Sequence, residues 1–199
     1  IFATEVRTAA KALMALGLEA DDKTSILGFN RPGWVIFHVA TMSAGGAPVG
    51  IYTTCSAPEV QYIVDHSESP VVLLEDEGQW EKIRAERERL PKLRHVVMMK
   101  GAPAIDDPMV LSWEAFLAKA AETSDADVDA RLDALEPDGL ATLIYTSGTT
   151  GPPKGVMLTH DNLAWTAKAL ERHIAGDDTF TAISYMPLSH IAEQLLTIH

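Results

Sequence analysis

The sequence predicts an α/β fold of three layers, in which a mostly parallel sheet is flanked by helices. Two observations support this prediction. Short apolar runs typical of buried strands alternate along the chain with longer stretches whose apolar residues recur at helical spacing. Glycine and proline stand at many of the boundaries between them. Because a helix between two strands makes a crossover connection, this alternation implies parallel neighbouring strands with helices on both faces.

The first hundred residues show the alternation most regularly. A helix is expected from Thr4, because Val6, Ala9 and Leu13 follow at helical spacing, and Gly17 is placed to end it. The same reasoning assigns the elements that follow. They are a strand at 23–29, a helix at 33–44, a strand at 47–52, a helix at 57–67, a strand at 70–76, a helix at 78–90 and a strand at 94–99.

The pattern weakens between Gly101 and Asp138. One helix is expected at 112–122, and the stretch after it is rich in aspartate and poor in large apolar residues. We therefore expect 101–138 to be an irregular acidic connector. A calcium loop is another interpretation of its acids, but the stretch lacks the central glycine and terminal glutamate of such loops.

Regular elements return at residue 140. An apolar strand at 140–146 leads into a polar loop, and a strand at 155–159 and a helix at 160–175 follow it. Thr159, His160 and Asn162 suit the start of that helix. A further strand is expected at 179–187 and a last helix at 189–199. Four tryptophans are expected to pack in the interior, namely Trp34, Trp80, Trp113 and Trp165.

Composition excludes several classes of protein. Lys and Arg total 16 against 28 Asp and Glu, and a net charge of -12 disfavours nucleic acid as a partner. The single cysteine, Cys55, cannot pair within the chain and fits a reducing cytoplasm. No apolar run approaches the ~20 residues of a membrane span, so we expect a soluble protein, for which peripheral membrane contact stays open. Without an initiator Met, the chain is expected to be an excerpt truncated at both ends.

The stretch "YTSGTTGPPKG" at 145–155 is the candidate binding loop. Its glycines allow positive φ and close approach of a ligand to the backbone, its hydroxyls can donate hydrogen bonds, and its lysine supplies a positive charge. Pro152 and Pro153 donate no hydrogen bonds and are expected to stiffen the loop. The loop is therefore expected to bind an anion. The candidate binding residues are Thr146, Ser147, Gly148, Thr149, Thr150, Gly151 and Lys154.

Two common motifs do not fit this loop. In a Walker P-loop, a second glycine would replace Pro153 and a hydroxyl residue would replace Gly155. In a serine hydrolase elbow, GxSxG, a glycine would replace Tyr145. The plain alternative is a polar hairpin tip, for which glycine, proline, serine and threonine are ordinary residues.

The loop closely resembles the phosphate-binding signature of the adenylate-forming, or AMP-binding, superfamily. The stretch from "GFNRPGWVIFHVATMSAGG" to "VVLLED" is similar to the early region of long-chain, bubblegum-type acyl-CoA synthetases, and "MPLSHIAEQ" resembles their next motif. The resemblance covers essentially the whole chain. It implies that residues 1–199 are part of an N-terminal adenylation domain, without the C-terminal domain that carries a catalytic lysine.

The resemblance also implies an activity. A fatty acid would attack the α-phosphate of ATP to give an acyl-adenylate and pyrophosphate, and coenzyme A would then displace AMP. The loop would hold the β- and γ-phosphates with the help of Mg²⁺. Long-chain fatty acid, ATP and coenzyme A are the expected partners, and residues 1–199 alone are expected to be inactive. Another adenylate-forming ligase, for aryl or medium-chain acids, or a non-catalytic nucleotide-binding module is the alternative.

His190 is the candidate catalytic residue outside the loop. It follows Pro187 and a predicted strand end, where α/β folds place ligand groups. A helix cap, a packed core histidine and a metal pair with Glu193 at i, i+3 are other interpretations, although no further metal ligands cluster nearby in the sequence, and no metal ligand is assigned. The resemblance implies that His190 lies beside the carboxylate and the adenylate.

Overall fold

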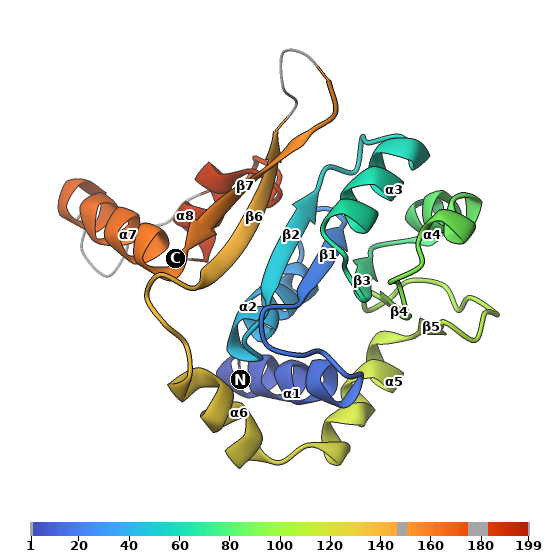
Figure 1. The fold of residues 1–199 in the computed structure, drawn as a ribbon, viewed down its shortest axis with the longest axis horizontal. Helices are drawn as coiled ribbons and strands as arrows, with labels where there is room; N and C mark the ends of the chain where they lie inside the picture. Colours follow the sequence, from blue (N-terminus) through green and yellow to red (C-terminus); the bar gives the residue numbers. More distant parts are fainter. Residues whose placement is uncertain (1, 147–150, 175–182, 199) are drawn as a thin grey trace.

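The described residues form a seven-stranded sheet in the order β5-β4-β3-β1-β2-β6-β7, and among these strands only β7 runs antiparallel to its neighbour (Figure 1). A computed structural model describes residues 2–146, 151–174 and 183–198 of the chain. The strands are β1 (Lys23–Leu27), β2 (Ala47–Ile51), β3 (Val71–Leu74), β4 (His95–Met98), β5 (Val110–Leu111), β6 (Leu140–Thr146) and β7 (Lys154–Thr159). The predicted α/β class with a mostly parallel sheet is confirmed.

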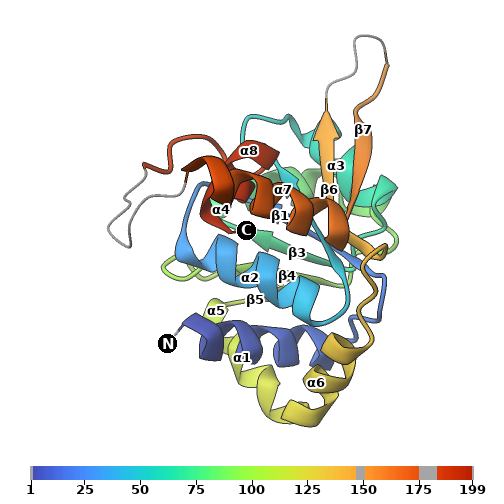
Figure 2. The same cartoon turned by 90° about the vertical axis from the view of Figure 1, so that its left-hand side faces the viewer.

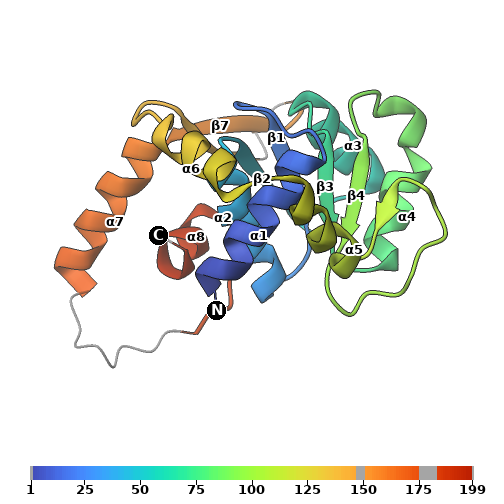
Figure 3. The same ribbon diagram turned by 90° about the horizontal axis from the view of Figure 1, so that it is seen from below.

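Helices cover both faces of this sheet (Figures 2 and 3). The α-helices are α1 (Phe2–Ala15), α2 (Pro32–Ser43), α3 (Ala57–His66), α4 (Glu77–Ala85), α5 (Trp113–Ala118), α6 (Asp125–Asp133), α7 (His160–Ile174) and α8 (Ile191–Thr197). Two 3₁₀ turns, η1 (Arg87–Arg89) and η2 (Lys119–Glu122), complete the helical elements of the described residues. None of the helices in the described ranges is long and apolar enough to cross a bilayer.

Two apolar cores lie on opposite faces of the sheet. The α1–α2 face packs α1, α2 and α5 against strand residues such as Ile26 and Leu73. The α3–α4 face packs α3 and α4 against Leu27, Leu74 and their neighbours. Successive strand residues point to opposite faces, and in β1 and β3 both faces are covered. This is why these strands appear in the sequence as continuous apolar runs.

The segment 101–138 is more ordered than predicted. Helix α5 and turn η2 occupy the helix predicted at 112–122, but β5 and α6 were not predicted, so the prediction of an irregular connector is wrong where these two elements lie. Helix α6 begins with a capping box in which Ser124 and Asp127 bond each other's backbone N–H groups. Its one buried residue is Val128, which joins the core of the α1–α2 face.

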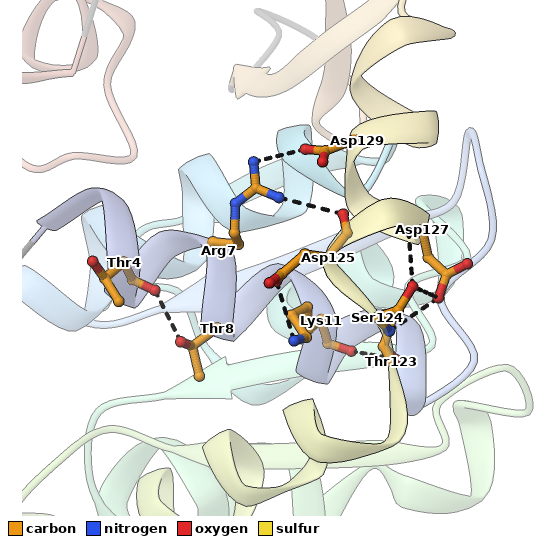
Figure 4. A network of polar contacts seen from close by, with 9 residues as sticks. All are labelled: Thr4, Arg7, Thr8, Lys11, Thr123, Ser124, Asp125, Asp127 and Asp129. Carbon is orange, nitrogen blue, oxygen red and sulfur yellow. Dashed lines mark hydrogen bonds and ion pairs between the residues drawn. The ribbon is translucent and has the colours of Figure 1, made fainter.

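The acids of α6 are partners of α1 (Figure 4). Arg7 forms an ion pair with Asp129 at 2.7 Å, and Lys11 forms one with Asp125 at 3.1 Å. The Thr123 hydroxyl also donates to the backbone oxygen of Lys11 at 3.0 Å. The aspartates that suggested a solvated connector therefore cap α6 and pair it with α1.

Two further predictions fail in the second half of the chain. Residues 183–187, the described part of the strand predicted at 179–187, form no strand. Trp165 is 71% exposed on α7, whereas Trp34, Trp80 and Trp113 are buried as predicted. The start of α7 is confirmed, since the Thr159 hydroxyl accepts from the backbone N–H of Asn162 and the Asn162 side chain accepts from that of Thr159.

Candidate functional site

The candidate loop closes a hairpin made by β6 and β7. Thr146, the last residue of β6, is paired with Lys154, the first residue of β7, and both are exposed. Directly opposed residues of an antiparallel pair project to the same face. The hydroxyl of Thr146 and the ammonium of Lys154 therefore stand side by side where the loop begins and ends.

The hairpin projects beyond the rest of the sheet (Figure 1). The parallel pairing of β6 with β2 includes Leu143 and Ile144 and goes no further, whereas the pairing with β7 continues to Thr146. Thr146 and Lys154 are thus carried past the edge of the parallel sheet, where a ligand can reach them from several sides.

Gly151 meets the expectation for a glycine in a binding loop. Its φ is +98°, a conformation that residues with a side chain rarely adopt, and no atom of the described residues lies within 4 Å of where a Cβ would be. The space beside its backbone is open to a ligand. Four other predicted binding residues lie outside the described ranges, and these are Ser147, Gly148, Thr149 and Thr150.

Tyr145 supports the base of the hairpin from the α3–α4 face. Its side chain is buried in that core, and burial raises the pKa of its hydroxyl to about 12. Gly155 pairs with it across the hairpin, and a Cβ on Gly155 would be 3.3 Å from the Tyr145 ring. Because side chains alternate along a strand, Thr146 and Lys154 point toward the opposite, α1–α2 side.

His190 caps α8. It is exposed, its backbone is extended, and its Nδ1 accepts a hydrogen bond from the backbone N–H of Ala192 at 3.2 Å. The helix-cap interpretation of this residue is therefore supported by geometry, and Nε2 is the nitrogen left to face a ligand. In the described part of the chain, no group of three or more His, Cys, Asp or Glu residues could hold a metal ion.

A network that sequence reasoning missed holds the segment before His190. The Asn30 side-chain amide donates to the Ser184 hydroxyl and to the Met186 backbone oxygen, both at 2.7 Å. Its oxygen accepts from the backbone N–H of Leu188 at 2.9 Å. Asn30 follows β1, so one polar side chain fixes a segment more than 150 residues away in the sequence.

Helix α8 and the sheet complete this support. The buried side chain of Gln194 donates to the Leu188 backbone oxygen at 2.8 Å, and Glu193 accepts from the Met186 backbone N–H at 3.3 Å. Ser189 lies against β2, where a Cβ added to Gly50 would be 2.8 Å from the Ser189 Cα. Only a glycine at position 50 allows the two backbones to approach this closely. Glu193, considered as a metal ligand, is instead a structural residue of this turn.

The structure thus brings together some of the predicted residues. Thr146 and Lys154 are neighbours, and Leu188, two residues before His190, joins the core of the α1–α2 face. No hydrogen bond or ion pair joins His190 to Thr146 or Lys154 within the described ranges. A cavity of about 520 Å³ between α1, α2 and α5 includes none of these residues.

Comparison with known proteins shows related sequences. The family model described as AMP-binding enzyme matches residues 2–199. The chain is 39% identical over 198 residues to the long-chain-fatty-acid–CoA ligase ACSBG2 of Xenopus laevis, covering 98% of this chain and 27% of the relative. It is 40% identical over 195 residues to human ACSBG1, covering 95% of this chain and 27% of the relative.

Solved structures share the fold. A putative long-chain-fatty-acid CoA ligase from Rhodopseudomonas palustris matches with a TM-score of 0.79 at 14% identity, over 98% of this chain and 46% of that one. ATP-bound MatB from the same organism matches with a TM-score of 0.71 at 24% identity, over 98% of this chain and 36% of that one. The chain therefore spans less than half the length of each of these proteins.

Proposed function

Because the chain belongs to the AMP-binding enzyme family, we propose that it contributes the phosphate-binding hairpin of an ATP-dependent long-chain fatty acid–CoA ligase. The observation that carries the proposal is the pairing of Thr146 with Lys154 at the base of a loop whose Gly151 has positive φ and open space beside it. A hydroxyl, a cation and an accessible backbone together suit a polyphosphate. The choice of a long-chain fatty acid rests on the ACSBG relatives.

Each described residue has a task in this proposal. Lys154 would neutralise charge on the β- and γ-phosphates, and Thr146 would donate a hydrogen bond to a phosphate oxygen. Charge neutralisation and in-line alignment are what attack by a weak carboxylate nucleophile on the α-phosphate requires. The same tasks are proposed for Ser147, Gly148, Thr149 and Thr150 from their place in the motif.

His190 would line the acyl and adenylate side of the site. Its Nδ1 is engaged by the Ala192 backbone, which orients the ring and leaves Nε2 available to the fatty acid carboxylate. We assign it a substrate contact and no metal. Mg²⁺ would be a counter-ion held mainly by the phosphate oxygens of the triphosphate, because no group of three or more His, Cys, Asp or Glu residues among those described could hold it.

The activity is proposed for the whole protein. The chain spans about 27% of the curated relatives, and positioning of reactants can account for about 7–11 kcal/mol of a barrier. We propose that residues 1–199 alone do not turn over, because an incomplete set of substrate contacts leaves the reacting atoms unaligned.

The test uses the full-length protein with ATP, Mg²⁺, palmitate and coenzyme A. We expect pyrophosphate release that depends on the fatty acid, followed by thioester formation. Faster turnover with an aryl or medium-chain acid would replace the substrate assignment and keep the reaction class. ATP binding without pyrophosphate release in the presence of any acid would overturn the proposal in favour of a nucleotide-binding module.

A further inference from the structure

In the part of the hairpin that extends past the parallel ladder, one side-chain hydrogen bond among the described residues reaches the body of the protein. The Tyr145 hydroxyl lies 2.7 Å from Nδ1 of His66, the last residue of α3. The two rings meet edge to face, with centroids 5.8 Å apart and planes at 85°. Tyr62, one turn earlier on α3, stacks on the His66 imidazole at 5.3 Å. The imidazole is therefore held between two aromatic rings and one hydroxyl.

The contact between Tyr145 and His66 lies where β6 leaves the parallel sheet. Backbone pairing between β6 and β2 does not extend past Ile144, so Tyr145 is the first residue of β6 beyond the parallel ladder. From Tyr145 to Met157, within the described ranges, the His66 contact is the only side-chain hydrogen bond from the hairpin to the rest of the chain. The next residue along β6 is Thr146, which is paired with Lys154.

Tyr145 is well placed to transmit the position of α3 to the hairpin. Its ring is buried in the core of the α3–α4 face and lies against Gly155 on the opposite strand. A tyrosine hydroxyl is protonated at neutral pH, so in the Nε2–H tautomer of His66 the Tyr145 hydroxyl donates to Nδ1. Through Tyr145, the end of α3 therefore contacts β6 directly and β7 by way of Gly155.

We infer that His66 is a positioning residue for the phosphate-binding hairpin, acting through Tyr145. By holding Tyr145, it sets the angle at which the hairpin leaves the sheet, and hence where Thr146 and Lys154 stand relative to the nucleotide. His66 itself does not touch the ligand. This inference rests on the proposed function of the hairpin as a triphosphate site.

The experiment is a double-mutant cycle in the full-length protein. Tyr145→Phe keeps the buried ring and removes the hydroxyl, and His66→Ala removes the partner. Tyr62→Phe is the matched control, because it removes a hydroxyl from the ring on the other side of His66, for which no hydrogen bond is found among the described residues. ATP affinity is measured by calorimetry, with KM values for ATP and fatty acid and thermal stability alongside.

We expect each single variant to weaken ATP binding by about two- to tenfold, the range of one neutral hydrogen bond. The double variant should be no weaker than the weaker single variant. KM for the fatty acid should stay within twofold, as should ATP affinity in Tyr62→Phe. His66→Asn, whose amide can occupy the place of Nδ1, should recover part of the affinity.

Different results separate the inference from the proposed function. If wild-type protein binds ATP and the single variants bind it equally well, the inference is wrong and the proposed function stands. A loss of thermal stability without loss of ATP affinity would show that the contact is purely structural, and would overturn the inference as well. Additive losses in the double variant would mean that the two residues act separately. Wild-type protein that fails to bind ATP would overturn the proposed function, and the inference with it.

Discussion

Asn30 and Leu188 stand 158 residues apart in the sequence and are joined by a hydrogen bond of 2.9 Å from the Leu188 backbone N–H to the Asn30 side chain. The same side chain donates to Met186 and Ser184. The turn that leads to His190 is therefore fixed by the loop after β1. In the sheet, strand β1 is separated from β6 by β2. The candidate site depends on residues from both halves of the chain.

Replacing Asn30 by Ala should destabilise this turn. The backbone groups of Met186 and Leu188 would lose their partners while partly buried, at a cost of about 1–3 kcal/mol each if water cannot replace the side chain. We expect a lower free energy of unfolding and a higher KM for the fatty acid, measured by denaturant titration and steady-state kinetics.

Asn162→Ala provides the control for that variant. Its side chain caps the exposed start of α7, where water can replace the lost hydrogen bond. We expect a smaller loss of stability and no change in KM for the fatty acid. Equal effects of the two substitutions on KM would show that the Asn30 network has no special part in the site.

Gly50→Ala should act on the same turn from the other side. The added Cβ would lie 2.8 Å from the Ser189 Cα and 3.2 Å from the Trp34 ring. Both residues are buried, so neither can easily move away from the new atom. Overpacking of this kind costs about 1–3 kcal/mol. The measurement is the midpoint of thermal unfolding, together with KM for the fatty acid.

Gly33→Ala is the matched substitution with the opposite expectation. Its Cβ would meet nothing closer than 4.0 Å, and Gly33 lies in the first turn of α2, where alanine is favoured over glycine by up to about 1 kcal/mol. We expect unchanged or raised stability. If Gly50→Ala is tolerated as well as Gly33→Ala, the close approach of Ser189 to β2 is not a constraint.

The strands and most helices could be predicted because their buried residues form a recognisable apolar pattern in the local sequence. Strands covered on both faces need continuous apolar runs, and glycine and proline mark many of their ends. Helix α6 was missed because Val128 is its only buried residue, so it has no apolar stripe. Its capping box, Ser124 with Asp127, was the available signal.

The binding loop could be identified because its residues are contiguous, whereas its supports are not. Asn30 and His66 lie far in sequence from the groups they contact, and nothing local distinguishes them from ordinary polar residues. Trp165 was expected inside on hydrophobicity alone, yet exposed apolar side chains are common on protein surfaces. Such assignments depend on tertiary contacts.

Ser124→Ala tests the order of the acidic segment. Loss of a serine cap costs about 1 kcal/mol, and Ser124→Thr should restore most of it. Hydrogen bonds from Ser124 lower the pKa of Asp127, so the carboxylate part of the cap contributes fully above the ordinary aspartate pKa and is lost as the pH falls through the lowered value. The difference in stability between wild type and Ser124→Ala should therefore narrow at acidic pH, which denaturant titrations at several pH values can check. A constant difference across pH would show that Asp127 takes no part.

Gly151→Val should weaken ATP binding in the full-length protein. A β-branched residue is least tolerated at positive φ, and its side chain would occupy the open space beside the loop backbone. Gly101→Val is the matched control, since Gly101 also has positive φ and open surroundings but follows β4, which β3, β1 and β2 separate from the hairpin strand β6. Both should carry a similar backbone strain of about 1–2 kcal/mol. Only Gly151→Val should reduce ATP affinity by calorimetry, and equal affinities in the two variants would identify Gly151 as an ordinary turn residue.

Lys154→Ala should reduce adenylate formation by about 10- to 150-fold, the value of one charge-assisted hydrogen bond of roughly 1.5–3 kcal/mol. Lys154 is exposed and forms no ion pair among the described residues, so little of the loss should come from folding. Lys168→Ala removes the same charge from the exposed surface of α7 and should leave the rate within twofold. Lys154→Arg retains the charge with a different shape, and should lie between wild type and alanine. Fatty-acid-dependent pyrophosphate release is the measurement. Equal rates for the two alanine variants would mean that the net charge of the protein, and not the position of Lys154 beside Thr146, governs the reaction.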